Sequence, residues 1–208
     1  MNQTPRAISP SSGPLLPRLV NAVLLRRAFY DAVAADARAT GPAGAVVCLA
    51  AVARESVALY QLSQASKGWG LILALIVVFA LVRWLLYAAV MYPIARALSH
   101  QAVEFKRLLR CLGFAETPAV LSLVGFAVGD ALFPYVQFGV GVWLLLATIV
   151  AVRSATGESN RQAILIGALG FAAYLGIGLA SDVALHAPTS APQLDPARTA
   201  VEQSAGSG

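Results

Sequence analysis

Three ionisable residues lie within long stretches of the sequence that are otherwise apolar. Arg54 and Glu55 interrupt AGAVVCLAAVARESVALYQL, and Arg83 is the single charge in LILALIVVFALVRWLLYAAVMY. Charged side chains in an apolar helix usually face the interior of a bundle and pair, and they often mark an ion or proton path. We expect these three residues to form either such a functional site or a structural ion pair.

The expected depths of two of these residues in a membrane favour a pair between Glu55 and Arg83. The two stretches enter the membrane from opposite sides, near residues 43 and 70. Glu55 and Arg83 then lie roughly 18–20 Å from the point of entry of their own stretch, close to the middle of a core about 30 Å thick. Arg54 is a competing partner in this pair. Glu116 is the next acid available to Arg83.

No motif of a catalytic or metal-binding class is present in the sequence. G-x-S-x-G, the P-loop, H-E-x-x-H and CxxC are all missing. The two histidines fall on opposite sides of the membrane in the topology derived below, so they cannot share a site. We therefore expect a protein that is not an enzyme and that uses no cofactor and no metal.

The composition indicates that lipid surrounds the folded chain. Of the 208 residues, 58% are hydrophobic and 12% are charged, about half the charged fraction of soluble domains. The sequence predicts an all-α integral membrane bundle of five transmembrane helices. These spans run over residues 43–62, 70–92, 114–131, 135–152 and 162–181.

The basic residues indicate how the spans are oriented. Eleven of the fifteen fall before the first span or in the loops after the second and fourth spans, two fall in the alternate segments, and Arg54 and Arg83 lie within spans. Because positive residues gather in cytoplasmic loops, we expect a cytoplasmic N-terminus and a multi-pass protein of the cell membrane. This distribution explains the pI of about 9.6 without a nucleic-acid partner.

The two ends of the chain differ from the membrane domain, which we expect over residues 41–182. Residues 1–40 begin with a Pro/Ser-rich stretch that predicts disorder. They continue in a helix that either lies against the membrane as an interfacial helix or leads in from the cytosol. Residues 183–208 are polar and rich in Pro, Ser and Gly, which predicts a disordered tail.

The string RLLRCLGFAETP forms the expected start of the third span. Arg107 and Arg110 are predicted at the lipid headgroups, which attract basic residues, and Gly113 is predicted to let the chain turn inwards. Residues 117–118, Thr-Pro, have the chemistry of a helix start. Glu116 is then either a residue at the helix terminus, where the dipole favours its charge, or a functional ion or proton site.

FKRLLRCLGFAETPAVL and FGVGVWLLLATIVAVRSATGESNRQAI resemble the Yip-type membrane family of Ypt/Rab-interacting proteins, in its bacterial branch. The resemblance covers about residues 40–180. The matching residues are the basic LLR, Gly113, Phe114, Ala115 and Pro118 of GFAxxP, then Gly141, Trp143, residues 151–153 and Arg161.

The resemblance implies five spans and a cytoplasmic N-terminus, in agreement with the charge distribution. Eukaryotic members of the family act with small GTPases, a role that bacterial relatives do not carry. Arg54, Glu55 and Arg83 depart from the family pattern.

Gly125 and Gly129 form a GxxxG motif in the expected third span, where small residues let helices approach closely. Either they pack the bundle, or they form a face for self-association. We interpret the protein as a membrane-organising scaffold whose partners are the lipid bilayer and other membrane proteins or further copies of itself. The alternative is a small transporter or channel subunit that uses Glu55 and Arg83.

Overall fold

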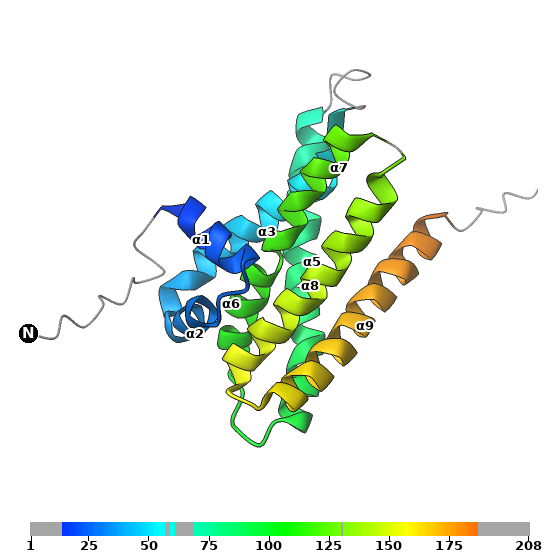
Figure 1. The fold of residues 1–208 in the computed structure, drawn as a ribbon. Helices are drawn as coiled ribbons and strands as arrows, with labels where there is room; N and C mark the ends of the chain where they lie inside the picture. Colours follow the sequence, from blue (N-terminus) through cyan, green and yellow to red (C-terminus); the bar gives the residue numbers. More distant parts are fainter. Residues whose placement is uncertain (1–13, 57–58, 61–68, 130, 187–208) are drawn as a thin grey trace, which may run out of the picture. The chain divides into compact units, whose positions relative to one another are not determined.

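The computed structural model describes residues 14–56, 59–60, 69–129 and 131–186. Over these residues the chain is helical and contains no strand, as the sequence predicts (Figure 1). The elements are α1 (Leu15–Val23), α2 (Arg27–Ala35), the 3₁₀ helix η1 (Ala37–Ala39), α3 (Thr40–Arg54), α5 (Trp69–Leu98), α6 (Phe105–Ala115), the 3₁₀ helix η2 (Thr117–Leu121), α7 (Ser122–Val128), α8 (Phe133–Thr156) and α9 (Asn160–His186).

The chain divides into two units, Met1–Tyr174 and Leu175–Gly208. The first unit contains the helical bundle and all side chains discussed below. Of the second unit, the structure describes the last part of α9, as far as His186.

Three helical stretches among the described residues are long and apolar enough to cross a membrane: α5, Phe105–Gly125 and α8. The chain is therefore suited to a bilayer, as its composition predicts. α3 has 15 residues, fewer than the roughly 20 that a full span needs. The described helices therefore support three candidate spans and do not confirm the five expected from the sequence.

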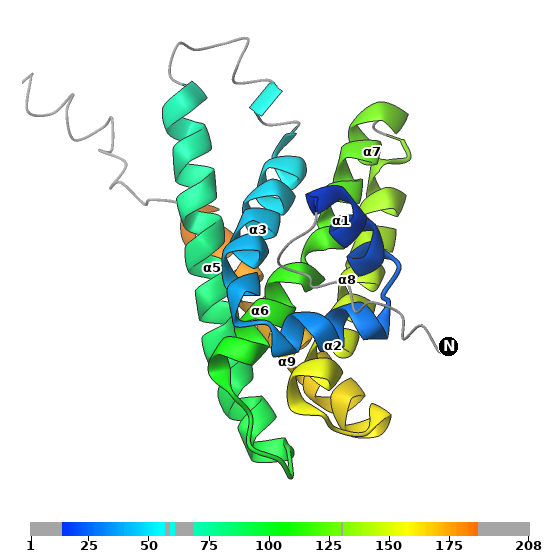
Figure 2. The same ribbon diagram turned by 90° about the vertical axis from the view of Figure 1, so that its left-hand side faces the viewer.

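Helix α6 forms the centre of the bundle. It contacts α2, α3, α5 and α8 (Figure 2). Of the 18 consecutive residues that are most apolar in Phe105–Gly125, 72% are buried, compared with 22% of the corresponding residues in α5 and 28% in α8. Protein therefore encloses the central stretch, whereas α5 and α8 turn apolar surface outwards.

Two of the helix boundaries predicted from the sequence are wrong. Pro93 lies inside α5 instead of closing it, because the following turn is held by burial of Ala95 at 0% exposure. The third helical stretch begins at Phe105 and not at residue 114. Gly113 consequently lies within α6 and does not turn the chain.

The N-terminal segment folds as two helices rather than one. α1 and α2 are separated at Leu25, whose φ is 53°, and both contact α6. Tyr30 of α2 is fully buried, and its hydroxyl donates to the Ala22 carbonyl at 3.3 Å. Burial raises the pKa of Tyr30, so the hydroxyl acts as a neutral donor. Residues 1–13 and 187–208, where the sequence predicts disorder, lie outside the described residues.

The GxxxG motif does not form one packing face. Gly125 is buried in α7, and a Cβ there would lie 2.9 Å from the Phe133 ring of α8. Gly129 ends α7 with a φ of 78°, and a Cβ there would meet nothing within 4 Å. Gly125 thus permits a close approach of α7 to α8, whereas Gly129 supplies the left-handed conformation of a turn.

The basic run of α6 is not laid out along the lipid headgroups as the sequence suggested. Arg110 is 4% exposed and donates to the Ala34 carbonyl at 2.9 Å, in the last turn of α2. Arg107 donates to the Ser154 carbonyl at 3.0 Å, in the last turn of α8. A cation at a helix C-terminus compensates the dipole and the free carbonyls, so both arginines act as caps for neighbouring helices.

Candidate functional site

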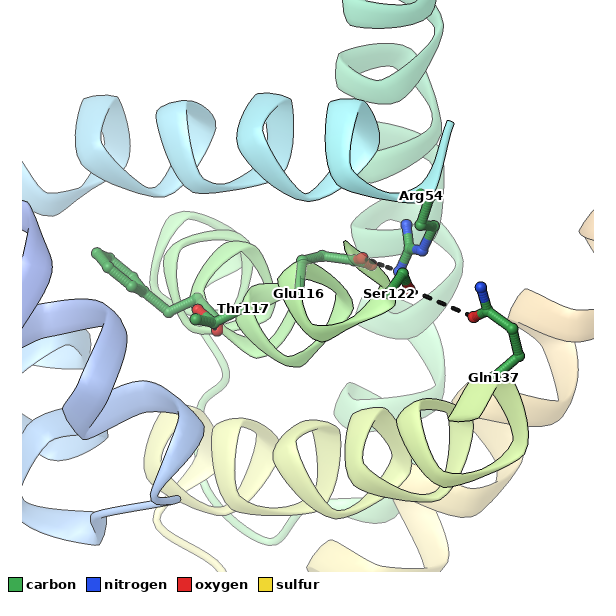
Figure 3. A network of polar contacts seen from close by, with 6 residues as sticks. Arg54, Glu116, Thr117, Ser122 and Gln137 are labelled. Atoms are coloured by element: carbon green, nitrogen blue, oxygen red, sulfur yellow. Dashed lines mark hydrogen bonds and ion pairs between the residues drawn. The ribbon is translucent and has the colours of Figure 1, made fainter. Parts of the chain in front are cut away.

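The candidate site is an ion pair between two helices in the interior of the bundle. The Nη2 atom of Arg54, at the end of α3, lies 2.5 Å from Oε2 of Glu116, at the junction of α6 and η2 (Figure 3). The two side chains are 19% and 12% exposed. The pair therefore joins two segments that are 62 residues apart in the sequence, within a largely apolar protein.

Both helices that carry the pair are interrupted beside it. α3 ends at Arg54, and Glu55 leaves the α-helical conformation with φ −89° and ψ 10°. The central stretch changes from α6 to the 3₁₀ helix η2 at Glu116. Broken helices at membrane depth are found where backbone and side chains line a buried site or cavity. The ion pair thus coincides with the point at which two helices lose their regular geometry.

The burial of the pair makes it energetically sensitive. Taking two charges out of water costs several kcal/mol each, and their attraction offsets this only when both partners remain. A carboxylate left alone in this position would be expensive, and so would a guanidinium. We therefore expect the folded state to require both Arg54 and Glu116 in their charged, paired form.

A cavity of about 240 Å³ lies between α3 and α5, and Arg54 is one of its lining residues. Glu55 and Arg83 line the same cavity, so the three ionisable residues singled out in the sequence lie together. The Glu55–Arg83 ion pair remains a prediction. The remaining walls are apolar and consist of Ala51, Ile72, Leu75, Ile76, Phe79 and Ala80.

Glu116 also lines a second, much smaller cavity. That cavity, of about 10 Å³, is lined by Tyr87, Leu144 and Phe171 in addition to Glu116. This volume is close to the minimum needed for one water molecule. Glu116 thus contacts the Arg54 guanidinium on α3 and also lines a small cavity with residues of α5, α8 and α9.

Further polar contacts continue along the central stretch near Glu116. The Thr117 hydroxyl donates to the Phe114 carbonyl at 2.6 Å and satisfies the end of α6. Ser122 lies 3.3 Å from Oε1 of Gln137 on α8, to which its hydroxyl donates (Figure 3). The first contact is local to the junction of α6 and η2, and the second joins α7 to α8.

The other residues of the GFAxxP motif are buried packing residues. Gly113 lies against Ala43 and Trp84, and a Cβ at this position would be 2.8 Å from the Ala43 Cβ. Phe114 stacks edge-on to Phe29 at a centroid distance of 5.3 Å. Ala115 is 3% exposed, and Pro118 is buried in η2. The motif therefore builds the junction of α6 with its neighbours, and within it Glu116 alone is ionisable.

The sequence identified all four ionisable residues of this region but not the Arg54–Glu116 pairing. The prediction set Glu116 at the membrane surface because it began the third span at residue 114. In the structure the helical stretch begins nine residues earlier, which carries Glu116 to the level of Arg54. Arg107 and Arg110 gave no signal of this shift, because the carbonyls that they cap are brought to them only by the three-dimensional arrangement of the helices.

Within the described part of the chain, no group of three or more His, Cys, Asp or Glu side chains is arranged to hold a metal ion. Comparison of the sequence with protein-family models and with curated proteins, and of the structure with solved structures, gives no match. The Yip-type resemblance therefore remains a prediction from the quoted motifs.

Proposed function

We propose that the protein is a non-enzymatic, multi-pass scaffold of the Yip type in the cell membrane, which organises its surroundings by binding other membrane components. The observation that carries this proposal is the outward face of α5. Large apolar side chains are exposed over the first part of this helix: Leu71, Leu75, Val78, Phe79, Val82, Leu85 and Leu86. We call this surface the α5 face.

An apolar face of this size requires either lipid or the apolar surface of another protein. Its residues repeat at helical spacing, so they present one continuous surface. A partner helix, including one from a second copy of this chain, would find there a complementary surface at membrane depth. We propose such a helix as the partner, with bilayer lipid covering the rest.

The proposed topology has five spans and a cytoplasmic N-terminus. It is supported by the contact between two loops on one side of the bundle. The Glu158 carboxylate accepts hydrogen bonds from the backbone N–H groups of His100 and Gln101 at 2.6 and 3.3 Å. The loops after α5 and after α8 therefore lie at the same end, together with the basic residues Arg107 and Arg110.

Reporter fusions test the topology. We expect fusions after Arg38, Arg107 and Ser159 to behave as cytoplasmic, and fusions after Lys67 and Asp182 to behave as external, because positive residues are retained inside. The measurement is paired alkaline phosphatase and fluorescent-protein activity in intact cells. An external signal at Ser159, or a cytoplasmic signal at Asp182, contradicts the five-span arrangement.

Site-specific photocrosslinking tests the scaffold function. A photoreactive residue at Val78 or Val82, on the α5 face, is expected to give discrete protein adducts in native membranes. The same residue at Phe138, exposed on α8, is the matched control and is expected to give lipid adducts only. Lipid adducts alone at all three positions contradict the proposal.

The second candidate function is a small transporter or channel subunit. It is favoured by the cavity that Arg54, Glu55 and Arg83 line beside two interrupted helices. Purified protein in liposomes would then increase the flux of protons, sodium or chloride, and the substitutions Glu55→Gln and Arg83→Gln would abolish the increase. Flux equal to that of protein-free liposomes removes this candidate for the three ions tested.

A further inference from the structure

We propose that the cavity between α3 and α5 binds an amphiphile with one carboxylate headgroup and one short alkyl chain. Two basic residues, Arg54 and Arg83, line the cavity, and apolar side chains form most of the remaining wall. A planar guanidinium matches a carboxylate with two parallel hydrogen bonds. The site does not require the proposed scaffold function, although Leu75 and Phe79 belong both to its lining and to the α5 face.

The size of the cavity limits the ligand to a single chain. Its volume of about 240 Å³ lies below the roughly 300–1,000 Å³ of pockets for drug-sized ligands. Ile72, Ile76 and Ala80 of α5 provide an apolar surface along about two helical turns. An alkyl chain follows such a surface, whereas a bulky polar ligand would leave its polar groups without partners.

The cavity opens towards the outer face of α5. Leu75 and Phe79 line it, and they are 47% and 69% exposed. Where bilayer lipid and not the proposed partner helix covers this side, it meets acyl chains, so a ligand that enters here comes from the lipid phase. The charged residues lie deeper along α5, because Arg83 is about 21 Å from the start of that helix at 1.5 Å per residue. A ligand with an apolar chain and an anionic group fits this order.

The charges around Arg54 predict opposite changes in ligand affinity when an acid or an arginine is removed. Glu116 pairs with Arg54 but borders the second cavity, so a carboxylate in the larger cavity competes with Glu116 for the same guanidinium. Glu55 lines the larger cavity itself and repels an anion there. Removing either acid therefore strengthens binding, and removing either arginine weakens it.

The test uses the full-length protein in nanodiscs of zwitterionic lipid, with sodium octanoate as the probe. We expect octanoate to raise the Tm in a saturable manner, and 1-octanol and sodium acetate at equal concentration to leave it unchanged. Octanol carries the chain without the charge, and acetate carries the charge without the chain. An equal shift with octanol overturns the proposal, because the effect is then partition into the apolar surface.

The variants provide the decisive comparison, measured as binding of radiolabelled octanoate per folded molecule. Arg83→Gln is expected to weaken binding about tenfold, the effect of losing one charge-assisted hydrogen bond, and Glu55→Gln is expected to strengthen it. Glu116→Gln is expected to act like Glu55→Gln. If Glu116→Gln does not fold, Glu55→Gln still tests whether removing an acid strengthens binding, because Glu55 is exposed. Equal affinities in Arg83→Gln and Glu55→Gln, or changes in the same direction, overturn the proposal.

Discussion

Replacing either Arg54 or Glu116 with glutamine is expected to lower the free energy of unfolding by about 3–5 kcal/mol, because each change leaves one buried charge without its partner. The double variant Arg54→Gln with Glu116→Gln is expected to lose less than the sum of the two single losses. Removing both charges also removes both desolvation penalties. The measurement is a double-mutant cycle on unfolding by SDS in mixed micelles.

The exposed pair of Arg27 and Asp31 on α2 is the matched control for this cycle. Their side chains are 62% and 49% exposed at a distance of 3.5 Å, and such surface pairs typically contribute about 0–1 kcal/mol. We therefore expect a clear coupling energy for Arg54 with Glu116 and little for the control. Strictly additive losses at Arg54 and Glu116 contradict the interpretation of this contact as a buried ion pair.

Gly113→Ala is expected to destabilise the bundle by about 1–3 kcal/mol, the usual cost of an extra methyl group in a packed core. The new Cβ would lie 2.8 Å from the Ala43 Cβ, 3.2 Å from the Ala43 carbonyl oxygen and 3.1 Å from the Trp84 ring. α3 and α5 would both have to move away from α6. Thermal stability in detergent measures the effect.

Two further variants show whether the clash is the cause. Gly139→Ala in α8 adds the same methyl group where nothing lies within 4 Å, and we expect it to raise stability by up to about 1 kcal/mol through helix propensity. Ala43→Gly in the Gly113→Ala background removes the nearest atom and is expected to recover part of the loss. Equal stability of Gly113→Ala and Gly139→Ala contradicts the close approach of α3 and α6.

The sequence predicts the helical class and the outer helices well, because they carry the strongest signals. α5 and α8 are apolar on all sides, and such composition leaves few alternatives to a helix in lipid. The boundary at Pro93 could not be predicted locally, because packing of Ile94, Ala95 and Leu98 against the core outweighs the preference of proline to end a helix. Local sequence gives that preference but not the tertiary contacts that override it.

The central stretch was the hardest to predict, because it is enclosed by protein and not by lipid. Its basic residues suggested a loop, yet Arg107 and Arg110 serve the ends of other helices and thus belong to a packed helix. The ion pair of Arg54 with Glu116 depends on this shift in the start of the stretch. The depth of each acid relative to each arginine is set by the three-dimensional arrangement of the helices, which charge counting does not supply.

The two capping arginines of α6 differ in when their partners are made. Ala34 precedes Arg110 in the chain, so the ribosome has already delivered the end of α2 when α6 emerges. Ser154 follows Arg107 by 47 residues, and its carbonyl becomes available only after α8 has been synthesised. Until then, Arg107 lacks this carbonyl, and in the proposed topology anionic lipid at the cytoplasmic surface would attract it. In the proposed topology, we expect the same side chain first to help retain its loop on the cytoplasmic side and later to cap the completed α8.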